Sequence, residues 1–257
     1  MTHPGTAAGP APVSLTPGPD GRGGGAGGAG RDLAPGLAWL VQRAGLDDEA
    51  VAAVEQTLPA ALAPGAADPG LLVEALLGAE RAADALRVVA CTLPPREGIW
   101  WAWVAARHAV QTAPAPAPPT SIAALDAAER WVMEPTDEHR RAAWDAAQAA
   151  GIDTPAGCAA AAAFFTGGSV TPPNGPYVPP PAGVHVTVAA TAVLLAALQT
   201  DPARLREIAG VFAQQGVEIV RRLGGWDAAI VAARQRFDAQ AQLHAEASKP
   251  PTLPGQA

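Results

Sequence analysis

Apolar side chains recur every three to four residues through the middle of this chain, which is the period of an amphipathic α-helix. Proline stands at the starts of the periodic segments and glycine at their ends, as is typical of helices. The alternating runs and tight-turn signals of β-hairpins are missing. The pattern predicts an all-α fold of about eight to ten helices, packed as a compact bundle or as a short irregular array.

Proline, glycine and capping residues indicate where the individual helices begin and end. The longest apolar stripe runs from Leu72 to Ala90 and predicts one continuous helix that begins at Pro69. The predicted helical segments are 37–45, 47–59, 69–90, 96–112, 120–132, 137–151, 155–165, 184–198, 202–224 and 226–237.

One helix start is marked especially clearly. Thr136 precedes two acidic residues, and we expect its side chain to cap the helix that follows. In the same helix, Arg141 and Asp145 are four residues apart, so we expect them to form an ion pair on its surface.

Both ends of the chain differ from the middle in composition. Residues 1–30 are mostly Gly, Pro, Ala, Ser and Thr, which cannot bury enough apolar surface to offset the entropy lost on ordering. Residues 246–257 form a second, proline-rich end. We therefore expect disordered tails around one helical domain over residues 31–245. Within it, the stiff proline-rich stretch 113–119 either separates two lobes or joins the helices of one hairpin.

The most distinctive element is the tryptophan-rich run Trp100-Trp101-Ala102-Trp103. On a helix, Trp101 lies about 100° around the axis from Trp100, so the helix is apolar over a wide arc and should be covered from at least two sides. Large aromatic side chains fill the centre of an alanine-rich bundle. We therefore interpret the tryptophans chiefly as core anchors.

Polar residues beside the tryptophans leave a second interpretation open. Trp100 and Trp101 would line an aromatic ligand cavity, Arg107 would clamp an anion, and His108 and Glu97 would take polar roles. This arrangement would suit a small-ligand-binding protein or an enzyme.

Charge and cysteine content narrow the class of protein. A formal net charge of −7 argues against nucleic acid or an anionic membrane as the main partner. Segment 184–198 is apolar but shorter than the roughly 20 residues that cross a bilayer, so it predicts a buried core helix and no stable membrane insertion. A membrane-associated component is the weaker alternative.

Cys91 and Cys158 are interpreted as small buried hydrophobes in a reducing compartment, and we expect a cytoplasmic protein without a secretory signal.

Motifs for metal, cofactor or phosphate chemistry do not stand out. The five histidines show no ligand spacing, so we expect no metal site and no cofactor. The sequence Thr166-Gly167-Gly168-Ser169 looks like a phosphate-cradling loop, but it lacks a Walker lysine and follows a helix, which favours a helix stop. Arg140 and Arg141 would either bind an acidic partner or lie on a solvated helix face.

The stretch 166–181 is long for a connection in a compact domain, and its tip holds the only tyrosine, Tyr177. Loops of this length without secondary structure are usually functional or disordered. We therefore regard this loop as a candidate docking segment.

Three motifs in order resemble a known family. They are Pro94-Pro95-Arg96-Glu97-x-x-Trp100-Trp101, then Ala127-Ala128-Glu129-Arg130-Trp131-Val132 followed by Pro135-Thr136-Asp137-Glu138-x-Arg140-Arg141-Ala142-Ala143, and Ala163-Phe164-Phe165-Thr166-Gly167-Gly168-Ser169. As a set, over residues 71–223, they resemble an uncharacterised bacterial domain of unknown function. The resemblance implies an all-helical fold and genes that often lie near type VI secretion or forkhead-associated-domain genes. It implies no catalytic residue, because the family has no established activity.

On these grounds we expect a non-enzymatic interaction, adaptor or scaffold protein with a protein partner, accessory to a secretion system if the resemblance extends that far. The alternative is the small-ligand-binding protein or enzyme with its site at the tryptophan helix. The candidate binding residues are Glu97, Trp100, Trp101, Arg107, His108, Trp131, Arg140, Thr166, Gly167, Gly168 and Ser169.

Overall fold

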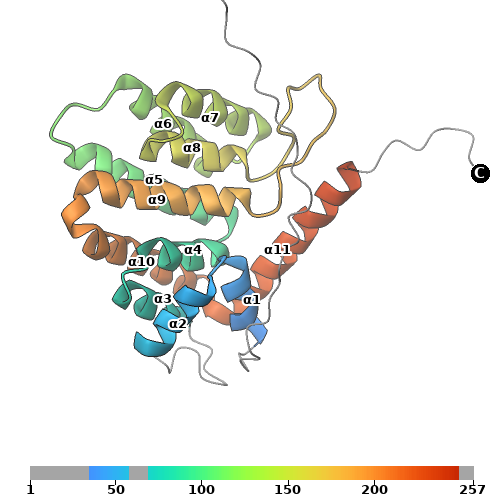
Figure 1. Ribbon diagram of the computed structural model, residues 1–257. Coiled ribbons are helices and arrows are strands. Elements are labelled where there is room, and N and C mark those ends of the chain that lie inside the picture. The colour runs from blue at the N-terminus through green and yellow to red at the C-terminus, as the bar shows by residue number, and fades with distance from the viewer. Residues whose placement is uncertain (1–34, 58–68, 249–257) are drawn as a thin grey trace, which may run out of the picture. The chain divides into compact units, whose positions relative to one another are not determined.

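The computed structural model describes residues 35–57 and 69–248, so the tail expected over 1–30 lies outside it. Most of the tail expected over 246–257 also lies outside the described residues, but residues 246 and 247 belong to the last helix. The described residues form eleven α-helices and a short 3-10 helix, without strands, which confirms the all-α prediction (Figure 1). The helices are α1 (Pro35–Arg43), α2 (Asp48–Thr57), α3 (Pro69–Gly78), α4 (Ala82–Thr92), α5 (Pro95–Thr112), α6 (Pro119–Met133), α7 (Asp137–Ala150), α8 (Pro155–Phe164), α9 (Val184–Thr200), η2 (Pro202–Arg204), α10 (Leu205–Arg222) and α11 (Gly225–Ala247).

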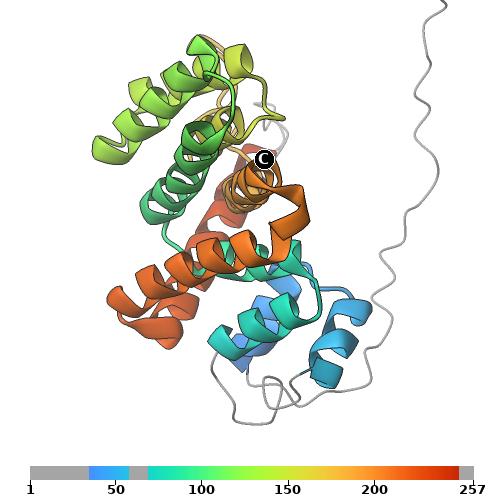
Figure 2. The same cartoon turned by 90° about the vertical axis from the view of Figure 1, so that its left-hand side faces the viewer.

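Helix α9 lies at the centre of the packing, between two groups of helices (Figures 1 and 2). On one side it contacts α5 and α8, and α8 in turn packs against α6 and α7. On the other side it contacts α4 and α10, with α3 beside them. Every residue of the alanine-rich helix α8 is buried. The small side chains let the helix axes approach closely, which is how a chain with few aromatics fills its core.

Two tryptophans of α5 tie neighbouring helices together. Trp101 is 1% exposed, and its Nε1 donates a hydrogen bond of 2.8 Å to the carbonyl oxygen of Phe212 in α10. Trp103 is also buried, and its Nε1 donates to the carbonyl oxygen of Leu125 in α6 at 3.1 Å. The interpretation of these two residues as core anchors is confirmed, and each indole N–H has the partner that burial requires.

The predicted continuous helix from Pro69 to Ala90 is wrong, because the chain turns between α3 and α4. Glu80 adopts a left-handed conformation with φ of 61°. The N–H of Arg81 bonds to the carbonyl of Leu76, and the N–H of Glu80 to that of Leu77, which is a Schellman ending with glutamate in the usual glycine position. The turn shifts the helical phase, so Ala83 of the predicted stripe is exposed.

Local signals at other boundaries are confirmed. The Thr136 side chain accepts a hydrogen bond from the N–H of His139 and caps α7. The expected pair of Arg141 with Asp145 is wrong, because Arg141 instead bonds to Asp137 one turn earlier, at 2.8 Å. The connector after α5 leads into α6, and these two helices pack directly against each other.

Candidate functional site

A cavity of about 810 Å³ opens between α5 and α10, and we call it the α5–α10 groove. Helix α5 contributes one wall, and one face of α10 forms the other. Its lining residues are Trp100, Trp101, Val104, Glu207, Gly210, Val211, Gln214, Gln215, Glu218, Ile219 and Arg222.

Trp100 is the exposed member of the tryptophan run. Its side chain is 45% exposed, whereas its neighbour Trp101 is almost completely buried. The interpretation of Trp100 as a core anchor is therefore wrong. Its counterpart on α10, Val211, is 55% exposed. Large apolar side chains that stand together at an open groove are typical of binding surfaces.

The α10 wall is regular. Between residues 207 and 222, its lining residues recur at intervals of three and four positions. They therefore follow one helix face for about 22 Å. Two glutamines, Gln214 and Gln215, lie in the middle of this face. Ion pairs stand at its ends, one between Arg204 and Glu207 and one between Arg222 and Glu218 at 3.1 Å. The groove thus has an apolar floor and a polar rim.

The titratable side chains that line this groove are ion-paired. The hydrogen bond from Arg204 lowers the pKa of Glu207, which keeps that carboxylate charged. Arg222 Nε donates a hydrogen bond to Glu218 at 3.1 Å. The lining contains no cysteine, serine or histidine that would act as a nucleophile or a base. This arrangement is suited to recognition of an apolar surface.

Three polar residues of the tryptophan helix that were candidates for ligand binding do not line the groove. The Arg107 guanidinium is 5.0 Å from the centre of the Trp103 ring. His108 is exposed and meets the Phe212 ring edge-on, with 5.8 Å between the ring centres. Glu97 is the acidic residue whose charge acts on Arg236 of α11. The structure therefore does not gather them around one ligand position.

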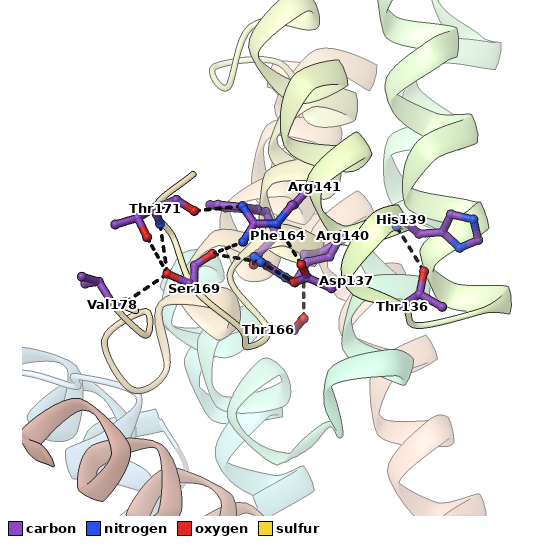
Figure 3. A network of polar contacts seen from close by, with 11 residues as sticks. Thr136, Asp137, His139, Arg140, Arg141, Phe164, Thr166, Ser169, Thr171 and Val178 are labelled. Atoms are coloured by element: carbon purple, nitrogen blue, oxygen red, sulfur yellow. Dashed lines mark hydrogen bonds and ion pairs between the residues drawn. The ribbon is translucent and has the colours of Figure 1, made fainter. Parts of the chain in front are cut away.

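Arg140 belongs to a second cluster, between α7 and the loop after α8 (Figure 3). It is 3% exposed, and its Nη1 donates to the carbonyl oxygen of Phe164 at 2.8 Å. Its Nη2 donates to the carbonyl oxygen of Ser169 at 2.9 Å, and its Nε to Asp137 at 2.8 Å. Arg140 thus neither lies on a solvated face nor is free for an acidic partner, because it fastens the loop to α7.

Glycine is required where the loop passes Arg140. Gly168 has φ of 66°, and a Cβ at this position would lie 2.8 Å from Nη2 of Arg140. Gly167 has free space around it, whereas Thr166 Oγ1 bonds back to the carbonyl oxygen of Ala163 at 2.8 Å. The sequence from Thr166 to Ser169 therefore follows the helix end, as predicted, and its second glycine fits the arginine.

Asp137 and Arg141 complete the attachment of the loop. Asp137 accepts hydrogen bonds from Arg141 and Arg140, which lower the pKa of its carboxyl group. Arg141 Nη1 also donates to the carbonyl oxygen of Thr171 at 2.9 Å. Farther along, the N–H of Val178 donates to Ser169 Oγ at 3.0 Å and closes the base of the loop. These bonds present the loop in one shape (Figure 3).

The predicted binding residues therefore separate into distinct places. Trp100 and Trp101 line the groove, whereas Arg140, Gly168 and Ser169 meet at the loop attachment. Trp131 is a buried residue of α6. Sequence reasoning missed the α10 wall, although one signal was present: Val211 lies off the buried stripe of its own helix.

The cysteines are confirmed as small buried residues. Cys91 and Cys158 are free thiols, and burial raises the pKa of each to about 12. Such a thiol is a poor nucleophile at neutral pH. In residues 35–57 and 69–248, no three His, Cys, Asp or Glu side chains come together as metal ligands would.

Among the described helices, none alone has the length and the apolar character to cross a bilayer. Helix α9 and residues 202–222 meet those requirements only as a pair, bent by 119°.

A model of a family of unknown function, DUF6931, matches residues 72–220. The chain belongs to this family. The DUF6931 region begins in α3 and ends in α10, so it includes every lining residue of the groove except Arg222, and also the loop attachment, while α1, α2 and α11 lie outside it. The expected membership in a domain of unknown function is confirmed. The comparisons with curated proteins and with solved structures gave no match.

Proposed function

We propose that this protein is a non-enzymatic adaptor that binds an apolar helical segment of a partner protein in the α5–α10 groove. The observation that carries the proposal is the exposed indole of Trp100 beside the open apolar face of α10. Tryptophan is among the residues that contribute most to protein interfaces, because it buries a large area with few rotatable bonds.

The shape of the groove favours a helix as the occupant. Its α10 wall extends for about 22 Å, which equals about four helical turns. A partner helix in such a groove inserts apolar side chains spaced three and four residues apart. Trp100 and Val211 would contact these side chains, and Gln214 and Gln215 would donate and accept hydrogen bonds beside them. The ion pairs at both ends would form the polar rim found in protein interfaces.

A small organic ligand is the second candidate occupant. The cavity of about 810 Å³ lies in the range of about 300–1,000 Å³ that small-molecule sites have. An accessory role near a secretion system and a cytoplasmic location, which the family resemblance and the composition imply, also remain parts of the proposal.

Cross-linking from inside the groove tests the adaptor function. A photoreactive phenylalanine replaces Val211 in cells that express the chain, and the protein captured there is purified as a binding partner. Calorimetry then compares its affinity for the unsubstituted chain with that for Trp100→Ala and for Met133→Ala. Met133 is 72% exposed on α6 and does not line the groove, so it is a matched control.

We expect Trp100→Ala to weaken binding more than tenfold, since interface tryptophans contribute about 2 kcal/mol or more. Met133→Ala should change the affinity less than twofold. Equal affinities of Trp100→Ala and Met133→Ala for the partner would contradict the groove as the binding site. The groove would also be contradicted if Tyr177→Ala lost binding while Trp100→Ala bound as the unsubstituted chain does. Capture of no protein, together with a thermal shift by small molecules that Trp100→Ala abolishes, would favour the second candidate.

A further inference from the structure

A second cavity, of about 380 Å³, is lined by residues of α1, α4, α9 and α11, and we call it the basic cleft. Two arginines from different helices line it, Arg43 at the end of α1 and Arg87 in α4. Its lining residues are Arg43, Ala44, Gly45, Arg87, Cys91, Ala182, Gly183, Val184, Val186, Thr187, Val188 and Phe237. It shares no residue with the α5–α10 groove.

One hydrogen-bond donor at this cleft is unused. Arg87 bonds through Nη2 to Asp84, but its buried Nε has no partner. His185 Nδ1 is the only other buried side-chain nitrogen or oxygen without a partner in the described part of the chain, and His185 does not line the cleft. Buried polar atoms are rarely left unpaired, so the Arg87 Nε indicates a missing acceptor.

Arg43 is held in position at the cleft. Its Nη2 donates to the carbonyl oxygen of Ala182 at 2.8 Å, and its guanidinium lies 3.8 Å from the centre of the Phe237 ring. Gly183 has φ of 82°, and a Cβ there would lie 2.6 Å from Nη2 of Arg43 and 2.3 Å from the Phe237 ring. The glycine therefore makes room for both side chains, which are ordered before any ligand arrives.

The charges at the cleft are not balanced within it. Asp84 is shared between Arg87 and Arg81, and Arg81 also pairs with Asp47 at 2.7 Å. In residues 35–57 and 69–248, Arg43 has no carboxylate within ion-pair distance. A positive site of this kind is notable in a chain with a net charge of −7.

We propose that the basic cleft binds a small carboxylate whose head contacts Arg43 and Arg87 and whose short aliphatic body lies against the apolar wall. Guanidinium groups present paired N–H donors that match the two oxygens of a carboxylate. The wall consists of Val184, Val188 and Phe237, which favours an aliphatic body over a bare inorganic anion.

This site would belong to the chain as a whole rather than to the DUF6931 region. Arg87 lies inside the matched residues 72–220, whereas Arg43 and Phe237 come from α1 and α11 outside them. The carboxylate site is therefore independent of the proposed adaptor function, and the two can succeed or fail separately.

Calorimetry and thermal unfolding with butanoate, hexanoate and inorganic phosphate, at constant ionic strength, test the proposal. We expect the two carboxylates to bind and to raise the melting temperature, with phosphate at least tenfold weaker. Arg43→Met should weaken carboxylate binding at least tenfold. Arg222→Met, which removes an exposed arginine of the groove, should leave it within twofold and serves as the matched control.

Gly183→Ala provides a second variant, because it displaces Arg43 without removing a charge, and it should also weaken binding at least tenfold. Circular dichroism of each unliganded variant confirms that it is folded. The proposal is overturned if neither carboxylate binds at 10 mM, a concentration about tenfold above an affinity on the order of 1 mM. It is equally overturned if folded Arg43→Met binds as the unsubstituted chain does, or if phosphate alone binds.

Discussion

His185 is a buried histidine whose surroundings disfavour its charged form. Burial lowers its pKa to about 4, and the nearby charges of Arg236 and Arg43 act in the same direction. In the sequence, it is a histidine inside the apolar segment 184–198. Its surroundings come from three helices, since Arg43 lies in α1, His185 in α9 and Arg236 in α11.

The lowered pKa of His185 predicts a loss of stability in acid. Above pH 6.5 the residue is neutral in both the folded and unfolded states, so its contribution is complete. Between pH 6.5 and about 4 only the unfolded state takes up the proton, and the free energy of unfolding falls by about 3 kcal/mol. Urea unfolding at several pH values should show a flatter profile in this window for His185→Leu. An unchanged slope would contradict this assignment.

Asp137 is the residue on which the loop attachment depends. At neutral pH we expect Asp137→Asn to destabilise the protein by about 1 kcal/mol, which is less than bonds to charged groups usually contribute because this carboxylate is largely exposed. Amide hydrogen exchange in residues 166–178 should become faster. The pKa of Asp137 is below its ordinary value of 3.8, so the difference should persist above pH 3.8 and vanish as the pH falls through the lowered value.

Asp145→Asn supplies the control for that experiment. Asp145 lies on the same helix, but Arg141 bonds to Asp137 instead. Its replacement should leave the exchange of the loop unchanged. Equal effects of the two substitutions would show that helix charge, and not the arginine contacts, determines the behaviour of the loop.

At the scale of elements, helix α10 contains two glycines with different surroundings. A Cβ on Gly216 would lie 2.3 Å from Cγ1 of the buried Val89 in α4, whereas one on Gly210 would meet only Leu77, at 3.8 Å. We expect Gly216→Ala to cost about 1–3 kcal/mol by overpacking. Gly210→Ala should be neutral or stabilising by up to about 1 kcal/mol, through helix propensity. Chemical denaturation measures both, and equal values would contradict the close approach of α10 to α4.

The ends of helices show what a local sequence pattern can and cannot predict. Capping of α7 by Thr136 follows from local chemistry, and it was predicted. The division between α3 and α4 was not predicted, because the stripe of apolar residues continues across it. The left-handed position that ends α3 is usually a glycine, but here it is Glu80. Arg81 at this turn bonds to Asp47 and Asp84, contacts that join α2 to α4 and exist only in the folded chain.

At the scale of the whole molecule, helix α11 lies outside the DUF6931 region but is tied to it. Its Gln240 donates to the carbonyl oxygen of Thr166 and accepts from the N–H of Gly183, both at 3.3 Å. Its Phe237 is buried against Arg43 and packs edge-on with Trp39 of α1. The helix therefore joins α1 to the loop after α8.

A chain that ends at Gly224 tests this role. We expect a loss of stability of at least about 3 kcal/mol, the cost of removing one buried phenylalanine. Hydrogen exchange should become faster at Gly183 and in α1, while α6, α7 and α8 keep their protection, since α11 does not pack on them. Unchanged exchange at Gly183 would contradict the contacts of α11.

The sequence by itself determined the helical class, most helix boundaries and the burial of both cysteines, because period, caps and composition act within a few residues of one another. Tertiary structure alone decided which tryptophan is covered. Trp100 and Trp101 are adjacent and chemically identical, yet α10 packs on one and leaves the other beside an open groove. The tertiary structure also brings Arg43 and Arg87 to one cleft. Such pairings depend on how distant helices pack, and local sequence patterns carry no information about that.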